Sequence, residues 1–239
     1  MKRLIVASLV FVLFSALITS VHASVTIQAV IDQNIHVIFN LENINSTIYA
    51  DIKQHKPSLD PSTIPQVILE NLKQRNLTRV EYYDSQLVFD DLDRSIHATF
   101  YLSGSDVFNS TVNKAMMVRV YHVRTDWRRF DVKLTDRFSL NFTEYFGTPV
   151  AKWQKINYTD PENRVHPAYF YNYTGPSPFD ALCYFILPTT ATNVRAIEDT
   201  IIFEAQASLE DTLLNSPFLI LGALIVVNIA AFVYRRARK

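Results

Sequence analysis

Apolar side chains occupy every second position in two runs near the start of the chain. The runs cover residues 25–31 and 35–41, and the polar residues Asp32, Gln33 and Asn34 separate them. A period of two is typical of a strand with one buried face, so the sequence predicts a β-hairpin. Residues 87–89 and 96–102 lie on either side of the acidic stretch 90–94 and predict a second hairpin.

Two segments between these hairpins carry apolar residues at helical spacing. Thr63 is expected to cap the second of them, a helix that runs to about residue 74. The apolar stripes consist of Ile44, Ile48 and Ile52 in the first segment and of Ile64, Val67, Ile68 and Leu72 in the second. The sequence therefore predicts two short helices, each packed by one face.

Later apolar runs predict strands over 117–123, 130–134 and 138–142, and a last strand pair formed by 182–187 and 200–204. Five prolines within 143–180 predict a less regular segment there. This order of elements favours an α+β fold, with one extracytoplasmic domain dominated by antiparallel sheet and carrying one or two short helices. A β-sandwich with a helical insertion is the alternative.

The first 23 residues have the pattern of a secretory signal peptide. Lys2 and Arg3 precede 15 uncharged residues, 4–18, and Ala23 ends a stretch of small or compact residues that suits signal peptidase. An uncleaved membrane anchor is the alternative, but a run of 15 is short for a span, which takes about 20 apolar residues.

Residues 215–234 predict a transmembrane helix near the other end. Ser216 and Pro217 resemble a cap followed by a first-turn proline, and no charged residue lies within 218–234. Basic residues beside a span mark its cytoplasmic side. The basic residues here are Arg235, Arg236, Arg238 and Lys239. We therefore expect a type I protein in the cell membrane, with domain 24–206 outside, a linker over 207–214 and a cytoplasmic tail over 235–239.

Asn228 is the one strongly polar residue within this apolar segment. An amide in hydrocarbon prefers a polar partner, and such contacts contribute about 0.6–2 kcal/mol. The sequence therefore predicts self-association or pairing with another membrane subunit through Asn228. A tolerated single Asn is the alternative, since no GxxxG motif accompanies it.

Charge is unevenly distributed along a chain whose formal net charge is zero. Residues 24–214 hold 17 basic against 23 acidic side chains, which leaves −6. An acidic domain is a poor nucleic-acid binder, so no nucleic-acid partner is expected. The four glycines are too dispersed for a phosphate-binding loop, and one cysteine excludes a multi-cysteine zinc site.

Six Asn-x-Ser/Thr sequons lie in the predicted external domain, although 13 asparagines would give about two by chance. The sequon asparagines are Asn45, Asn76, Asn109, Asn141, Asn157 and Asn172. This enrichment predicts a surface glycoprotein. We expect most of the six to be usable and one or two to be buried.

Histidine and cysteine positions give no recognisable metal or cofactor motif. Five histidines follow the signal segment, and no two lie within five residues of each other; they are His36, His55, His97, His122 and His166. His36 and His97 fall on the polar phase of the hairpins, which favours surface positions. Cys183 lies in an apolar run and could join a copper site, but a buried, inert thiol is favoured.

Two charged clusters allow alternative interpretations. Asp90, Asp91 and Asp93 could bind Ca²⁺, but the stretch lacks the EF-hand pattern, which favours a solvated turn. Arg124, Arg128 and Arg129 surround Trp127 and could clamp an anion or an acidic sugar. Local ion pairs with Asp126 and Asp131 explain these arginines equally well.

Nine aromatic residues between 142 and 173 could bind sugars or a protein partner if exposed, whereas packing within a sheet is favoured. We expect a membrane-anchored surface glycoprotein with a non-enzymatic binding or structural domain. One alternative is an accessory subunit of a membrane complex. The other is a tethered hydrolase with a cleft near Glu162, Arg164 and His166.

Overall fold

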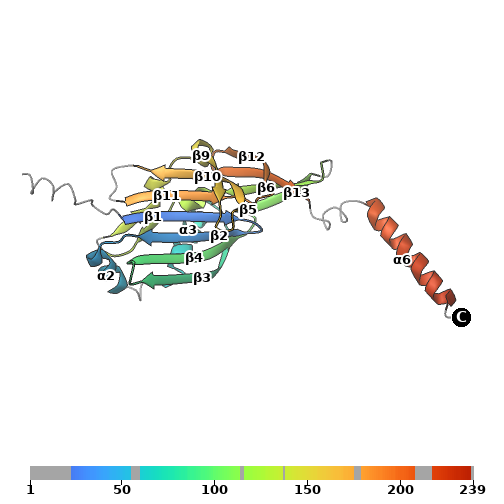
Figure 1. Ribbon diagram of the computed structural model, residues 1–239, viewed down its shortest axis with the longest axis horizontal. Helices are drawn as coiled ribbons and strands as arrows, with labels where there is room; N and C mark the ends of the chain where they lie inside the picture. Colours follow the sequence, from blue (N-terminus) through green and yellow to red (C-terminus); the bar gives the residue numbers. More distant parts are fainter. Residues whose placement is uncertain are drawn as a thin grey trace, which may run out of the picture.

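The computed structural model describes residues 23–54, 60–113, 116–136, 138–174, 179–207 and 217–237. The described part is rich in β-structure and has few helices (Figure 1). A domain dominated by β-sheet is therefore confirmed. The predicted signal peptide, except Ala23, lies outside the described residues, as do most of the linker and the last two residues of the tail.

The largest sheet has seven strands in the order β3-β4-β2-β1-β11-β10-β9. Its strands are β1 (Ala23–Ile31), β2 (Ile35–Glu42), β3 (Glu81–Asp90), β4 (Ser95–Ser103), β9 (Gln154–Thr159), β10 (Val165–Tyr173) and β11 (Phe179–Ile186). Neighbours pair antiparallel except β1 and β11, which run parallel. The first and last thirds of residues 24–206 therefore meet at the centre of this sheet.

A second sheet has four strands in the order β12-β13-β6-β5, and a third has two. The four strands are β5 (Phe108–Asn113), β6 (Val118–Arg124), β12 (Thr192–Ile197) and β13 (Thr200–Gln206); the two are β7 (Asp131–Lys133) and β8 (Ser139–Asn141). The helices are α2 (Ser46–Gln54), α3 (Thr63–Gln74), α4 (Phe142–Tyr145) and α6 (Pro217–Ala237), with single 3₁₀ turns η2 (Asp126–Arg128) and η3 (Val150–Lys152).

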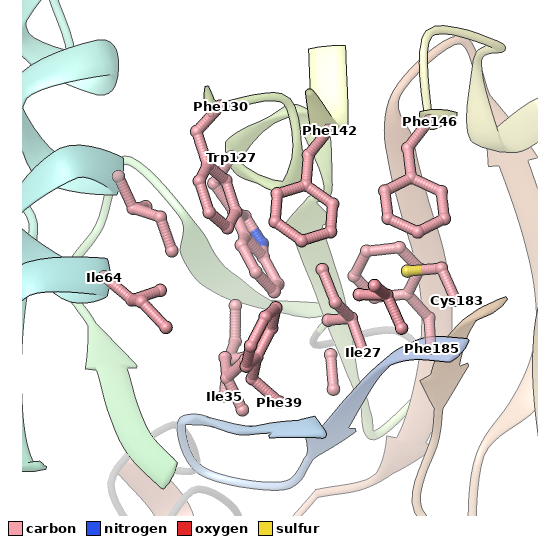
Figure 2. Close-up of a cluster of buried hydrophobic side chains, with 14 of the residues drawn as sticks. Ile27, Ile35, Phe39, Ile64, Trp127, Phe130, Phe142, Phe146, Cys183 and Phe185 are labelled. Carbon is pink, nitrogen blue, oxygen red and sulfur yellow. The ribbon is translucent and has the colours of Figure 1, made fainter. Parts of the chain in front are cut away.

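One face of the seven-stranded sheet forms one side of the hydrophobic core. Alternate residues of β1 and β2 are buried on it, as the hairpin pattern requires. Aromatic rings from the connecting segments cover this face (Figure 2). Phe142 contacts Phe39 edge-on at 5.6 Å, and Trp127 contacts Phe185 at 5.8 Å between ring centroids. Val123, Ile201 and Phe203 bring the second sheet into the same core cluster.

Most predicted elements are present, but the last strand pair and the irregular segment were predicted wrongly. Strands 182–187 and 200–204 do not pair with each other, because β11 joins the first sheet and β13 the second. Segment 143–180 is also more regular than its prolines suggested, since it contains β9 and most of β10. Pro167 fits into β10 because its backbone faces the β11 side just beyond the ladder between these strands, which begins at Ala168 opposite Ile186.

Thr63 is the first residue of helix α3 and not, as the sequence had predicted, its cap. Ser62 holds the cap position and its side chain makes no capping hydrogen bond. Asp60 instead accepts a hydrogen bond from the Ser62 backbone N–H at 2.7 Å. The acidic side chain therefore organises the turn that enters the helix.

Helix α6 has 21 residues and covers most of the predicted transmembrane segment. Among the helices that the structure describes, none is identified as sufficiently long and apolar to cross a membrane. The spanning role of 215–234 therefore stays a prediction from the sequence.

Candidate functional site

All six sequon asparagines are exposed on the β-rich domain, so the expectation that one or two are buried was wrong. Three belong to turns or helix ends, namely Asn45, Asn76 and Asn141, and three lie on strands, namely Asn109 in β5, Asn157 in β9 and Asn172 in β10. Each has Thr two residues later. Exposure is the condition that a glycan imposes, because an attached sugar chain cannot be accommodated in a core.

Asn45 and Asn141 have side chains held by local hydrogen bonds. The Oδ1 atom of Asn45 accepts from the backbone N–H of Thr47 at 2.9 Å, just before α2. The Oδ1 atom of Asn141 accepts from Glu144 at 2.8 Å and caps α4. An N-linked glycan attaches to the amide nitrogen, so neither hydrogen bond occupies the atom that would be modified.

Asn76 has a backbone reason to be asparagine. Its φ is 63°, in the left-handed region that Asn adopts more readily than most residues. It follows the end of α3, where Asn76 donates to Lys73 and Leu77 donates to Leu72, both at 3.0 Å. This pair of bonds is a Schellman motif. A turn role therefore explains the asparagine at position 76 independently of a glycan.

Asn157 and Asn172 mark one side of the seven-stranded sheet. Asn157 lies on β9, which is an edge strand of that sheet. Asn172 lies on the adjacent strand β10 and pairs with Leu182 on β11. The neighbours of Asn172, Tyr171 and Tyr173, pack against the core, so Asn172 occupies the opposite, outer face. Glycans at these two positions would hinder pairing of this edge with another chain.

The residues predicted to associate with the membrane are described only in part. Asn228 is exposed, and its Nδ2 atom donates to the carbonyl oxygen of Leu224 at 2.8 Å, one turn earlier in α6. The helix therefore supplies one partner for the amide itself. Arg236 is exposed, nothing is described of the Arg235 side chain, and Arg238 and Lys239 lie outside the described residues.

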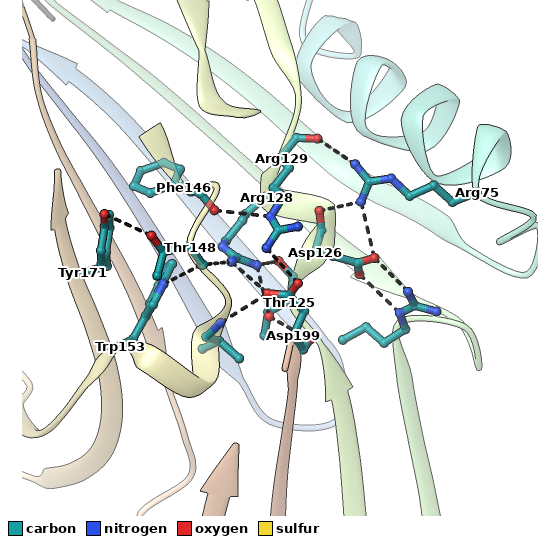
Figure 3. Close-up of polar contacts among 12 residues, drawn as sticks. Arg75, Thr125, Asp126, Arg128, Arg129, Phe146, Thr148, Trp153, Tyr171 and Asp199 are labelled. Carbon is teal, nitrogen blue, oxygen red and sulfur yellow. Dashed lines mark hydrogen bonds and ion pairs between the residues drawn. The ribbon is translucent and has the colours of Figure 1, made fainter. Parts of the chain in front are cut away.

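The arginines next to Trp127 in the sequence belong to a polar network that is only partly local (Figure 3). Arg124 pairs with Asp126 at 2.7 Å, as expected from the sequence. Arg128 and Arg129 instead pair with the two oxygens of Asp199, at 2.9 and 2.8 Å. Asp131, the other predicted partner, is exposed on β7. No local sequence signal links Asp199 to these arginines.

Arg128 is fully buried at the centre of this network. It donates to the carbonyl oxygens of Thr125 and Thr148 at 2.7 and 2.6 Å, and it lies 4.8 Å from the centre of the Trp153 ring. Burial lowers the pKa of Arg128, and the Asp199 carboxylate opposes this effect. Because the guanidinium is enclosed, it holds protein segments together, which leaves no room for the anion clamp considered above.

Cys183 is buried, as expected for an inert thiol. Burial raises the pKa of Cys183 to about 12, although nearby Arg128 acts in the opposite direction. A thiol with this pKa is almost fully protonated at neutral pH and is a poor nucleophile. Among the described residues, no group of three or more His, Cys, Asp or Glu side chains could hold a metal ion.

The residues suggested for a hydrolase cleft instead stabilise a turn between β9 and β10. Asp160 accepts from Arg164 Nε at 2.6 Å and from His166 Nε2 at 3.1 Å. His166 Nδ1 contacts the carbonyl oxygen of Leu187 at 2.9 Å, and Glu162 pairs with Arg164. Burial raises the pKa of the Asp160 carboxyl, but hydrogen bonds from Arg164 and His166 hold it well below its ordinary value. Both ring nitrogens are thus engaged, which makes His166 an unsuitable general base in this arrangement.

The acidic stretch between β3 and β4 is occupied by protein contacts. Asp90 accepts from the backbone N–H groups of Leu92 and Asp93 and so closes the turn. Asp91 accepts from Tyr49 at 2.8 Å and from Lys53. These contacts attach the hairpin to α2 and agree with the structural interpretation of the acidic stretch.

The histidines outside the β9–β10 turn are separated. His36 lies on the outer face of the seven-stranded sheet and stacks on Tyr101 at 4.4 Å, and burial lowers its pKa. His97 shares that face, His122 is on the second sheet, and His55 lies outside the described residues. The prediction that His36 and His97 occupy the outward-facing positions of their strands is therefore confirmed.

Most of the aromatic residues between 142 and 173 belong to the core, as favoured from the sequence. Phe142 and Phe146 are fully buried, and Tyr145, Trp153 and Tyr169 are nearly so. Phe170 and Tyr158 differ, since they lie on the outer face and contact Tyr184 at 4.8 and 6.1 Å. The core rings are not available to a ligand.

Comparison with known proteins does not assign the chain to a family. No family model matches the sequence, no curated protein matches it, and no solved structure matches the fold. Function must therefore be argued from the residues and their arrangement.

Proposed function

We propose that this chain is a single-pass membrane glycoprotein with an extracytoplasmic domain that acts as a binding or structural module at the cell surface. The observation that carries the proposal is the exposure of all six sequon asparagines. A sequon in a core position would argue against glycosylation, and none of the six is in one. The signal-like segment 1–23 and the basic residues after 234 support the same orientation.

The anchor in this proposal rests on the sequence. Residues 218–234 are uncharged, and most of the predicted span lies within helix α6. A helix rises about 1.5 Å per residue, so 20 residues extend about 30 Å, the thickness of a bilayer core. The glycosylated domain and the basic tail would then lie on opposite sides of the membrane.

The test is glycopeptide mass spectrometry of the full chain purified from its native membrane. Sugar masses are expected on most of the six asparagines. Thr111→Ala destroys the Asn109 sequon and should remove that glycan, whereas Thr111→Ser keeps the sequon and serves as the matched control. Six unmodified asparagines would overturn the glycoprotein proposal.

Orientation is tested separately in sealed vesicles. Protease added from the extracytoplasmic side should digest the β-rich domain, and a label on the C-terminal tail should stay protected until detergent is added. Digestion of the tail in intact vesicles would contradict the proposed topology. Release of the chain by alkaline carbonate would contradict the anchor.

A role as an accessory subunit of a membrane complex is the second candidate, and Asn228 favours it. The amide is exposed within an otherwise apolar stretch of α6. Asn228→Leu should weaken co-purification with a membrane partner after mild solubilisation. Because Asn228 also donates to Leu224, an unchanged complex would show that the helix itself satisfies the amide.

A further inference from the structure

A serine, a histidine and an asparagine form a continuous hydrogen-bonded chain on the outer face of the seven-stranded sheet. The Oγ atom of Ser95 lies 2.8 Å from Nε2 of His97. Nδ1 of His97 lies 2.9 Å from Oδ1 of Asn40. A nucleophile bonded to a base, which is in turn oriented by a third group, is the arrangement that activates serine in acyl-transfer enzymes.

Strand pairing places the three side chains together. Ser95 and His97 are two residues apart on β4, so they point to the same face. Asn40 is the residue directly opposite His97 on β2. Neighbouring residues in the sequence could not reveal this contact, because 57 positions separate Asn40 from His97.

The hydrogen-bond partners are compatible with a neutral imidazole that is protonated on Nδ1. Oδ1 of Asn40 is an acceptor, so Nδ1 of His97 carries a hydrogen and donates it. In this tautomer the Ser95 hydroxyl can donate to the lone pair of Nε2. This neutral tautomer is the one that a general base requires.

Ser95 is buried, with 4% of its surface exposed, and together with the half-buried His97 it lines a surface pocket of about 480 Å³. The pocket is bounded by Glu42, Asn43, Leu92, Asp93, Arg94, Ser95 and His97. Arg94 could stabilise negative charge on a reacting carbonyl oxygen. Glu42 and Asp93 would repel a carboxylate, which favours neutral or cationic substrates and the release of an acidic product.

We propose that Ser95, His97 and Asn40 form a catalytic triad that hydrolyses small, neutral or cationic carboxylic esters in this pocket. Ser95 Oγ attacks the ester carbonyl carbon while its proton moves to His97 Nε2. The bond to the alcohol oxygen breaks, and His97 donates the proton to the departing alcohol. Water then attacks the acyl-serine, passes a proton through His97 to Ser95, and releases the acid.

In this reaction Ser95 is the nucleophile and His97 the general base and acid. Asn40 is a positioning residue, because it acts through the imidazole ring and not on the substrate. The activity goes beyond the proposed surface glycoprotein and does not depend on it. A failed triad would leave glycosylation and anchoring unaffected, and unglycosylated protein could still hydrolyse esters.

The experiment treats the detergent-solubilised full chain with a fluorophosphonate probe and identifies the labelled peptide by mass spectrometry. A covalent adduct is expected on Ser95. Ser95→Ala should abolish it, and His97→Gln should slow labelling by about 100-fold or more, the contribution of a general base. Ser103→Ala is the matched control, since Ser103 lies on the same strand and face, outside the pocket lining. Labelling of that variant should equal the wild type.

The role of Asn40 is tested by two substitutions of similar size. Asn40→Asp keeps an acceptor for Nδ1 and should retain labelling, whereas Asn40→Leu removes the acceptor and should slow it at least about tenfold. Hydrolysis of p-nitrophenyl acetate should follow the same order, and circular dichroism should show each variant folded. No adduct on Ser95 in folded wild-type protein would overturn the proposal. So would ester hydrolysis that persists in Ser95→Ala.

Discussion

The ion pair between Arg128 and Asp199 offers the sharpest test of how this domain is held together. Arg128 has no exposed side-chain surface, whereas the Asp199 side chain is 21% exposed. The two residues are 71 positions apart and join η2 to the turn between β12 and β13. Asp199 also accepts from Arg129 at 2.8 Å and from the backbone of Val150 at 3.2 Å.

Asp199→Asn preserves the size of the side chain but removes its negative charge. Four hydrogen bonds of Arg128 are formed in the folded domain, to Thr125 twice, to Thr148 and to Asp199. The substitution keeps the hydrogen bonds from Arg128 to the carbonyl oxygens. It leaves the buried positive charge of Arg128 without its carboxylate partner. Breaking a buried pair in this way costs about 3–5 kcal/mol. For a domain of this size, we expect Tm to fall by roughly 6–20 °C.

The assay is urea unfolding followed by tryptophan fluorescence and circular dichroism. Trp127 and Trp153 are both buried, and Trp153 contacts Arg128, so fluorescence reports directly on this junction. Asp136→Asn is the matched control because Asp136 pairs with Lys133 on the surface, where a pair contributes less than about 1 kcal/mol.

A double-mutant cycle then separates the pair from its surroundings. Arg128→Met removes the buried charge together with its donors, so in the double variant only the partly exposed Arg129 still loses its carboxylate partner. The loss of unfolding free energy in the double variant should therefore be smaller than the sum of the two single losses. The expected difference is more than about 1 kcal/mol. A loss of unfolding free energy for Asp199→Asn no larger than that for Asp136→Asn would contradict a stabilising role of the buried ion pair. So would strictly additive losses for Asp199→Asn and Arg128→Met.

Three further predictions follow from single contacts. Asn76→Ala should lower the free energy of unfolding by about 1–2 kcal/mol while Asn76→Gly leaves it nearly unchanged, because only glycine adopts the left-handed conformation freely; equal urea midpoints would contradict this. The lowered pKa of Asp160 contributes stability above about pH 4 that is lost on acidification, so the Tm difference between wild type and Asp160→Asn should shrink from pH 7 to pH 2; a constant difference would contradict it. Cys183, whose pKa is about 12, should resist a thiol reagent at pH 8 in folded protein and react fully in urea, and rapid reaction before unfolding would show that the thiol is not enclosed.

Local patterns were sufficient where one face of an element is buried. The alternation in 25–31 and 35–41 predicted the hairpin β1–β2, and the stripe from Ile64 to Leu72 predicted α3. The same patterns did not indicate which strands pair with each other. Nothing in residues 182–187 indicates that they pair in parallel with β1, since an apolar run fits the centre of any sheet.

The candidate sites divide in the same way. A sequon is a contiguous motif, so all six were found from the sequence, although their exposure required the fold. The Ser95–His97–Asn40 chain could not be found, because its geometry depends on pairing between β2 and β4. The partner of Arg128 was missed because Asp199 comes from a different sheet hairpin.

The sequence by itself determined the alternation of the strands, the two amphipathic helices, the sequons and the segregation of charge. These are properties of residues close together along the chain, where spacing decides which side chains share a face. Tertiary structure decided which strands pair, which charges are buried together and which polar groups meet on the outer face. Those outcomes depend on burial and contact between distant segments, and no local pattern records them.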